Sequence, residues 1–306
     1  MKKKVYIQTG DDEIRTTIKL LEIVRPKIKD RVLIKPNLTM PASPESNICT
    51  SPKVVEGIVN YLRSRGIEDI VIGEGAGGAR NMSEYFEITG YKELSKRLDV
   101  PLIDLNNDEA VKLKVKDGYF LKTIPVAKTA LDRYIINVPK MKTHRLAIVT
   151  LALKNMMGAI LPYNGKAVLH PAYNDINERR KLEHRAIFNE DEFKRAQDDF
   201  FKGLADFYSV LKPNLNIIDG FTGKDGDGLT HGEDIRMNCI IASDNVIAID
   251  FVTSFLMGFD LSKLYLSYIK RNSLKNLNDI DIKTNVDIYQ LRKEFKPTLL
   301  TDEIVE

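Results

Sequence analysis

Two lysines and a histidine follow a buried-strand pattern in the middle of the chain, and these residue types could act together on an anion. The apolar run Tyr134–Val138 ends at Pro139. It is followed, at alternating positions, by Lys140, Lys142 and His144. An extended chain repeats every two residues, so these three side chains are expected to leave the backbone on the same side. The ammonium groups would bind a phosphate or a carboxylate, and the imidazole would move a proton.

The segment that follows adds another cation. Residues 147–161 are almost wholly apolar and predict a helix, interrupted only by Thr150, Lys154 and Asn155. An ammonium group is costly to bury without a partner, so Lys154 and Asn155 indicate a pocket for an anionic ligand. Alternatively, Thr150 and Lys154 could mark the one solvated face of a core helix.

Polar residues also follow two earlier strand candidates. Lys35 and Asn37 come directly after one apolar run, and Glu74, Gly75 and Gly77 lie in the segment GEGAGG after another. The backbone N–H groups of the glycines could form a nest for a phosphate or a carboxylate, or the segment could be a plain strand-to-helix turn. It contains neither the register of a dinucleotide fingerprint nor the GK[ST] of a P-loop.

A second glycine-rich stretch, GFTGKDGDGLTHG at 220–232, carries Asp225, Asp227 and His231. Carboxylates with an imidazole could ligate a divalent metal, and His231 or Asp225 could instead serve as an acid–base group. The spacing differs from that of a calcium loop, and turn-forming residues at the surface are the alternative. Further on, Asp244 is expected to cap a helix, and Asp250 inside that apolar helix needs a partner if it is buried.

The elements that must position these side chains alternate between strands and helices. A helix start at Ser51-Pro52 and a stop at Gly66 are typical of the segments between the strands. This alternation predicts an α/β fold, an open doubly wound and mostly parallel sheet with helices on both faces. Ligands bind at the carboxyl ends of such strands, where the polar residues above would gather. The strand candidates are 5–8, 31–34, 69–73, 101–105, 134–138, 215–219 and 238–242.

The organisation predicted for residues 1–306 is a single α/β domain, with a second lobe starting near 212 as the alternative. The charge-rich excursion 162–211 is expected to be a surface or lid-like insertion. Its second half, 189–211, is typical of an extended surface helix.

Composition limits the classes of function. The chain has 306 residues, 29% of them charged, and a formal net charge of only +3, which argues against a dedicated nucleic-acid binder. The two cysteines, Cys49 and Cys239, are too few for an iron–sulfur motif, and a disulfide between them stays open. No run is long enough to span a bilayer, and the N-terminus lacks the apolar core of a signal peptide, so we expect a soluble, cytoplasmic protein without a membrane partner.

The chain carries a series of short motifs in a defined order. They are KPN at 35–37, Ser51-Pro52, GEG at 73–75, Gly90-Tyr91, VPKMKTH at 138–144, LKNMMG at 153–158, IDG at 218–220, the GDGLTHG loop and SDNVIAID at 243–250. In this order and spacing they resemble the domain of unknown function 362 family from about residue 32 to residue 258. The resemblance implies an α/β domain and, in some relatives, an attached iron–sulfur ferredoxin module. This chain lacks the cysteine clusters of that module, so no iron–sulfur cluster is expected here.

These patterns favour an enzyme that acts on a small phosphorylated or carboxylated metabolite. Lysines, asparagines and glycine N–H groups would bind the anion, and the chemistry would be of the lyase or isomerase type, or a hydrolysis if a divalent metal is bound. The alternative is a non-catalytic anion-binding module or an accessory to a redox partner, and a homo-oligomer is also open. The expected substrate-binding residues are Lys35, Asn37, Gly75, Gly77, Lys140, Lys142, Lys154 and Asn155. The expected catalytic residues are His144, His231, Glu74 and Asp225, and the metal ligands would be Asp225, Asp227 and His231.

Overall fold

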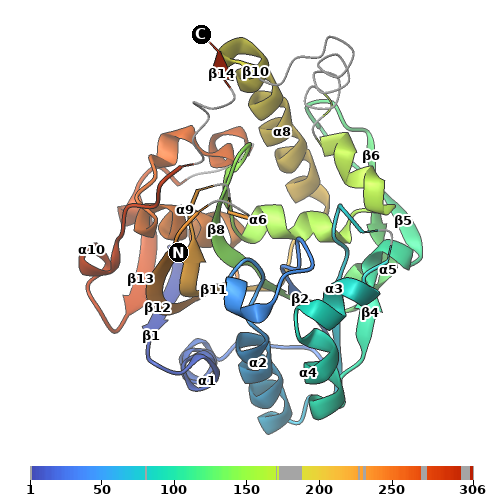
Figure 1. Ribbon diagram of the computed structural model, residues 1–306, viewed down its shortest axis with the longest axis vertical. Helices are drawn as coiled ribbons and strands as arrows, with labels where there is room; N and C mark the ends of the chain where they lie inside the picture. Colours follow the sequence, from blue (N-terminus) through green and yellow to red (C-terminus); the bar gives the residue numbers. More distant parts are fainter. Residues whose placement is uncertain are drawn as a thin grey trace.

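The computed structural model describes residues 2–79, 81–169, 171, 188–226, 228–229, 232–269, 274–297 and 304–305. Within them, ten strands form one sheet in the order β13-β1-β12-β11-β7-β2-β3-β4, with β8 joined to β11 and β9 joined to β8 (Figure 1). The strands are β1 (Lys3–Thr9), β2 (Arg31–Pro36), β3 (Asp69–Glu74), β4 (Leu102–Asp104), β7 (Tyr134–Val138), β8 (Lys140–His144), β9 (Ile148–Thr150), β11 (Leu215–Lys224), β12 (Asp234–Ser243) and β13 (Ile280–Thr284).

Most neighbouring strands of this sheet run parallel. The exceptions are β12, which is antiparallel to β1 and β11, and β9, which is antiparallel to β8. Each of the seven predicted strands is present, and the prediction of an open, mostly parallel α/β sheet is confirmed. The carboxyl ends of β2, β3 and β7 therefore lie at one edge, and β8 continues from β7 past Pro139 along β11.

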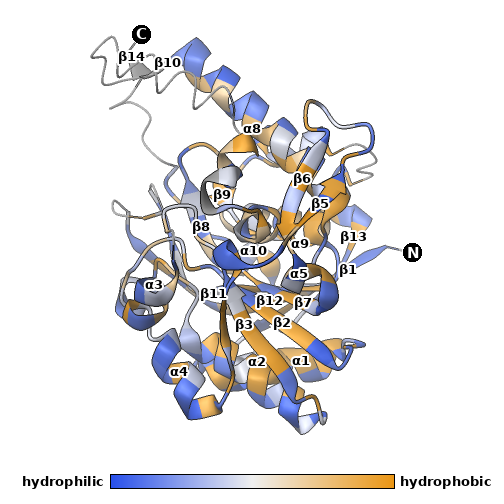
Figure 2. Ribbon diagram, turned by 90° about the vertical axis from the view of Figure 1, so that its right-hand side faces the viewer, coloured by the Kyte–Doolittle hydropathy of each residue, from blue (hydrophilic) through white to orange (hydrophobic). Residues whose placement is uncertain are grey.

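Helices cover both faces of the sheet because the strand residues alternate between two cores. Val32 and Ile34 pack in one core with α1 (Glu13–Val24), α2 (Pro52–Ser64), α3 (Ser83–Ile88) and α4 (Tyr91–Leu98). Leu33 packs in the other with α5 (Lys128–Asp132), α6 (Ala152–Asn155), α8 (Glu190–Val210) and α9 (Val246–Leu256). Figure 2 shows the hydrophobic strands β2 and β3 between α1, α2 and α4 on one side and α9 on the other.

Two of the predicted helices are present, and the first of them, α2, begins and ends at the residues that the sequence indicates. The side chain of Ser51 caps α2 by accepting a hydrogen bond from the backbone N–H of Lys53, and Gly66 follows its end with φ 75°. The helix predicted over 189–211 is α8, and its inner face is buried through residues such as Phe200, Leu204 and Phe207. Part of the excursion 162–211, residues 170 and 172–187, lies outside the described residues, so its predicted surface or lid-like role stays a prediction.

The helix predicted over 147–161 is wrong. Ile148 has φ 67° and starts β9, which pairs with β8 as a hairpin. Only the short α6 and the 3₁₀ turn Met156–Ala159 follow it. The two carboxylate oxygens of Asp250 accept the backbone N–H groups of Ala152 and Leu153, at 2.7 and 2.9 Å, and so fix the start of α6. The continuous apolarity thus reflects burial rather than one long helix.

Further elements have weaker signals in the sequence. A separate hairpin joins β5 (Ala110–Lys114) to β6 (Thr123–Ala127), β10 (Phe188–Asn189) pairs with β14 (Ile304–Val305), and α10 (Ile288–Leu291) follows β13. Asn245 rather than Asp244 caps α9.

Cys49 and Cys239 are both buried free thiols. Within the described part of the chain, no helix is long and apolar enough to cross a membrane.

Candidate functional site

Four lysines from different elements gather beyond the carboxyl ends of β2 and β3. We call Lys35, Lys142, Lys154 and Lys166 the lysine cluster. They come from β2, β8, α6 and the 3₁₀ turn Tyr163–Leu169. Lys35 acts electrostatically on both Lys154 and Lys166, and Lys142 acts on Lys154. Three of these lysines, Lys35, Lys142 and Lys154, are among the expected substrate-binding residues, whereas Lys166 was not expected.

Lys35 is neutralised by Glu74 at the base of the cluster. Its Nζ lies 2.7 Å from Oε1 of Glu74, and both side chains are buried. Burial lowers the pKa of Lys35, and the Glu74 carboxylate opposes this shift. Gly158 covers the pair so closely that a Cβ there would lie 1.9 Å from Oε1 of Glu74. This geometry favours an internal ion pair over direct contact between Lys35 and a ligand.

Glu74 also organises the loops that follow two strands. Its oxygens accept the backbone N–H groups of Gly75, at 2.8 Å, and Leu38, at 3.2 Å. The N–H of Ala76 donates to Sδ of Met82. The N–H groups of Gly75 and Ala76 are therefore engaged inside the protein, which favours a strand-to-helix turn over an open nest at these two positions. The role of Glu74 that best fits these contacts is to position the loops.

A second buried ion pair lies beside the cluster. Nζ of Lys140 is 2.9 Å from Oδ2 of Asp219, which also accepts the backbone N–H of Ser51 at the start of α2. Glu13 of α1 accepts a hydrogen bond from the Ser51 hydroxyl, and burial followed by the Asp219 charge raises the pKa of Glu13. Sequence reasoning missed Glu13, because an acidic residue in a first helical turn needs no site to explain it.

Lys142 and Lys154 have different surroundings. Nζ of Lys142 donates to Oγ1 of Thr39 at 3.1 Å and to the carbonyl oxygen of Ile48 at 3.0 Å. Lys154 is half-buried, and no hydrogen bond or ion pair joins its ammonium to the residues that the structure describes. Burial, reinforced by Lys142 and Lys35 and opposed by Glu74, lowers the pKa of Lys154 to about 7.

Lys166, in the 3₁₀ turn Tyr163–Leu169, is the fourth lysine of the cluster. Its Nζ donates to Oδ1 of Asn106 at 2.8 Å and to the carbonyl oxygen of Ile160 at 2.9 Å. Burial is the main reason that the pKa of Lys166 falls to about 8, with Glu74 opposing the shift. No recognisable motif surrounds this lysine in the charged excursion, so only the fold reveals it.

The two expected asparagines bond to each other. Nδ2 of Asn37 donates to Oδ1 of Asn155 at 2.9 Å, and Nδ2 of Asn155 donates to Oδ1 of Asn137 at 2.8 Å. Asn137 in turn donates to the carbonyl oxygen of Ala152. This buried amide chain ties β2 and β7 to α6, so it holds Lys154 in place.

His144 lies at the end of β8 and packs on α8. Its ring stacks on Phe200 with centroids 6.4 Å apart, and its Nδ1 accepts the backbone N–H groups of Leu146 and Ala147. In the neutral ring, an Nδ1 that accepts hydrogen bonds assigns the ring hydrogen to Nε2. His144 therefore fits a hydrogen-bond donor better than a general base.

The expected metal site is only partly covered by the structure. Asp227 and His231 lie outside the described residues. Oδ1 and Oδ2 of Asp225 accept hydrogen bonds from the backbone N–H groups of Glu233, at 2.6 Å, and Lys296, at 3.2 Å. The Asp225 carboxylate therefore holds its own loop against the segment that contains Lys296. Among the described residues, no three His, Cys, Asp or Glu side chains form a group that could hold a metal. The metal site stays a prediction.

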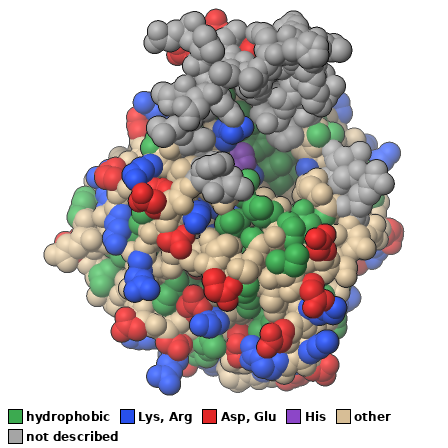
Figure 3. Space-filling model, viewed as in Figure 1, with side chains coloured by type: hydrophobic (Ala, Val, Ile, Leu, Met, Phe, Trp, Pro, Cys, Tyr) green, Lys and Arg blue, Asp and Glu red, His purple; other side chains and the backbone are tan. Residues whose placement is uncertain are grey.

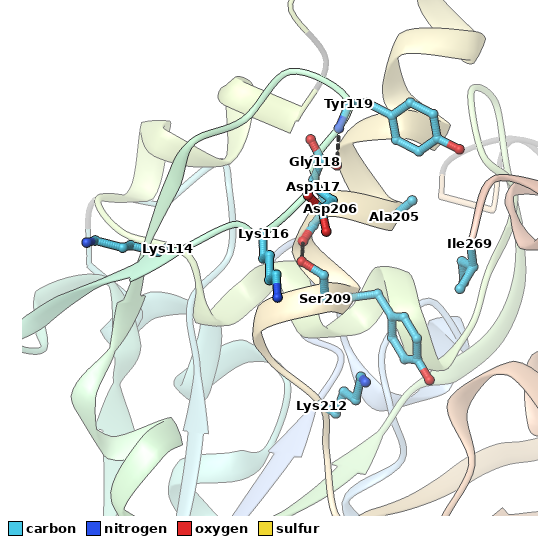
Figure 4. A pocket seen from close by; sticks show the side chains of 11 residues that line it. Lys114, Lys116, Asp117, Gly118, Tyr119, Ala205, Asp206, Ser209, Lys212 and Ile269 are labelled. Atoms are coloured by element: carbon cyan, nitrogen blue, oxygen red, sulfur yellow. Dashed lines mark hydrogen bonds between the residues drawn. The ribbon is translucent and has the colours of Figure 1, made fainter. Parts of the chain in front are cut away.

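A separate pocket of about 320 Å³ lies between α8 and the loop that joins β5 to β6 (Figure 4). Lys114, Lys116 and Lys212 line it with Tyr119 and Tyr208. Because α8 ends there and leads into the amino end of β11, this pocket is distant from the carboxyl ends of the strands. Elsewhere, on the face shown in Figure 3, basic and acidic side chains are interspersed around a hydrophobic centre.

Comparisons with known proteins bear on the same region. A family model described as a domain of unknown function, DUF362, matches residues 32–254. A thylakoid-associated protein of Synechocystis sp. is 28% identical over 234 residues, which are 76% of this chain and 64% of that protein. The chain thus spans less than two thirds of that relative. The lactate racemase apoprotein of Thermoanaerobacterium thermosaccharolyticum aligns with a TM-score of 0.44 at 12% identity, over 84% of this chain and 57% of that one.

Proposed function

The chain belongs to the DUF362 family, and we propose that it is an enzyme that binds a small phosphorylated or carboxylated metabolite at the lysine cluster and transforms it by acid–base chemistry. The observation that carries this proposal is the charge balance of the cluster. Glu74 forms an ion pair with Lys35, whereas no carboxylate in the described part of the chain forms an ion pair with Lys154 or Lys166. A bound anion would supply the missing negative charge.

The lowered pKa values support acid–base work at the same place. An efficient proton-transfer group has a pKa near the working pH, and buried lysines reach this range readily. With pKa values of about 7 and about 8, Lys154 and Lys166 can exchange protons near neutrality. Neighbouring cations would also stabilise an enolate-like or oxyanion-like intermediate. Lyase or isomerase chemistry is therefore the preferred class, and hydrolysis applies if a divalent metal is bound near Asp225, Asp227 and His231.

The test is anion binding by variants of the cluster. Lys154→Met and Lys166→Met keep much of the buried volume and remove the charge. Each variant is expected to bind malonate or inorganic phosphate about ten-fold or more weakly, since a charge-assisted contact contributes about 1.5–3 kcal/mol. Affinity is measured by calorimetry and thermal shift.

Two controls locate the binding. Lys96→Met changes an exposed lysine of α4, and Lys212→Met changes the separate pocket. Both are expected to bind the anions like the unmodified protein. If both cluster variants keep full affinity, or if Lys212→Met loses it, the proposed site is wrong. Tight binding without turnover of any anionic metabolite would favour the alternative, a non-catalytic anion-binding module.

A further inference from the structure

We propose that Lys154 is a nucleophile that condenses with a carbonyl group of the bound anion, so that the substrate class is a small aldehyde or ketone that carries a phosphate or a carboxylate, such as a 2-oxo acid. This inference rests on the proposed function, because it places the substrate in the same lysine cluster.

The hydrogen bonds divide the buried lysines into two kinds. Lys35 and Lys140 each form an ion pair, at 2.7 and 2.9 Å, and Lys166 donates to two oxygens. The nitrogens of these three lysines are therefore already engaged by acceptors inside the protein. Lys154 has no such acceptor within the described residues, so its nitrogen is the one whose lone pair can be released without breaking an internal hydrogen bond.

The position of Lys154 is fixed although its nitrogen has no hydrogen-bond partner among the residues that the structure describes. It lies in α6, whose first N–H groups donate to Asp250, and Asn155 beside it is held by Asn37 and Asn137. In Figure 1, α6 lies near the middle of the molecule, where it contacts β7 and β9. A rigid backbone with a half-buried amine at its surface is the arrangement that a covalent catalyst requires.

Burial, together with the charges around Lys154, lowers the pKa of its amine and keeps part of it neutral. Lys142 and Lys35 repel a proton on its nitrogen, and Glu74, already bonded to Lys35, attracts one less strongly. At pH 7 about half of this amine is unprotonated, whereas an ordinary lysine is almost fully charged. Lys166, which stays mostly protonated, can hold the anionic group of the substrate at the same time.

The proposed step balances without any further reactant. The neutral Nζ of Lys154 forms a bond to the carbonyl carbon as the carbon–oxygen double bond becomes single, and one proton passes from the nitrogen to the oxygen to give a neutral carbinolamine. A second proton lets the oxygen leave as water, so one protonated amine and one carbonyl compound yield one iminium ion and one water. The iminium withdraws electrons from the adjacent carbon, which favours loss of a proton or of a carboxylate there.

The experiment traps this adduct in the full chain. Pyridoxal 5′-phosphate with sodium borohydride, and separately pyruvate with sodium cyanoborohydride, are added at pH 7.0 in limiting amounts, and labelled peptides are mapped by mass spectrometry. Lys154 is expected to be labelled at least about ten times faster than exposed Lys96, because the lowered pKa of Lys154 leaves more of its amine neutral. Malonate in excess should slow the labelling of Lys154 and leave that of Lys96 unchanged.

A conservative variant separates the two proposals. Lys154→Arg keeps a cation and is expected to bind malonate within about three-fold of the unmodified protein, while labelling at 154 is lost and no other cluster lysine replaces it. If malonate binds the cluster but neither probe labels Lys154 faster than Lys96, the nucleophile is wrong and the anion site stands. If malonate does not bind the unmodified protein, the proposed function itself fails.

Discussion

At the scale of single residues, the lowered lysine pKa values couple anion binding to protons. A bound anion raises the pKa values of Lys154 and Lys166 from about 7 and about 8, so the complex holds more protons than the free protein between pH 7 and 9. Malonate affinity is therefore expected to fall as pH rises through this range, by up to about ten-fold per pH unit for each group that titrates. Calorimetry in buffers of different ionisation enthalpy measures the proton uptake.

Variants of the lysine cluster show which lysine takes up the proton when malonate binds. Lys154→Met should reduce the protons taken up at pH 7.5, and Lys96→Met should not. Binding with no proton exchange at any pH in the range would mean that the anion does not meet these lysines.

Residue types at this site were predictable, but their roles were not. The grouping of Lys35 and Glu74 near the carboxyl ends of β2 and β3 follows from the general rule for open α/β sheets. Whether a carboxylate is free for catalysis or holds loops in place depends on which backbone N–H groups donate to it. For Glu74 and Asp225 these donors come from residues such as Leu38 and Lys296, whose approach is a property of the folded chain.

At the scale of elements, Asp250 decides whether α6 forms. This helix has only four residues, so its stability depends on the cap rather than on its own hydrogen bonds. Asp250→Ala leaves the buried N–H groups of Ala152 and Leu153 without an acceptor and should lower the free energy of unfolding by about 3 kcal/mol. Urea denaturation at pH 8 measures the change.

The companion variants separate the cap from mere loss of a charge. Asp250→Asn keeps one acceptor oxygen and should lose less stability than Asp250→Ala. Asp244→Asn, an exposed neighbour of α9, should change the free energy of unfolding by less than about 0.5 kcal/mol. Equal stability of Asp250→Ala and the unmodified protein would show that α6 does not need this cap.

The sequence predicts the elements that have local signals and fails where a distant residue such as Asp250 sets the conformation. The strands and α2 have local signals, such as their β-branched runs and Ser51-Pro52, and these elements form as predicted. The segment 147–161 has helical composition, but its conformation is set by Asp250, about a hundred positions away, and by pairing of β9 with β8. Long-range partners of this kind leave no mark in a local pattern.

The loop between β5 and β6, beside the separate pocket, is likewise held by a residue far away in the sequence. Asp206 of α8 accepts the N–H groups of Tyr119, Phe120 and Leu121, and Figure 4 draws this carboxylate beside the loop. The β5–β6 hairpin is thereby fastened to α8. Nothing near Asp206 in the sequence indicates that it holds a loop from 85 to 87 residues earlier.

At the scale of the whole molecule, the order of the strands predicts one cooperative unit. The N-terminal strand β1 lies between β12 and β13, with Tyr6 opposite Ala242 and Val5 opposite Ile282. In the middle of the sheet, Leu215 of β11 pairs with Ile136 of β7. A lobe starting near 212 would have to separate from strands on both of these sides, which would expose the core on each face of the sheet.

We therefore expect a single unfolding transition, in which the calorimetric and van't Hoff enthalpies agree. Because the chain has 12 tyrosines and no tryptophan, near-UV circular dichroism reports tertiary packing through tyrosine, and far-UV circular dichroism reports the backbone. Their midpoints in urea should coincide, and malonate should move both together by binding the folded state alone. Two resolved transitions, of which malonate shifts only one, would instead reveal two lobes and confine the anion site to the lobe that shifts.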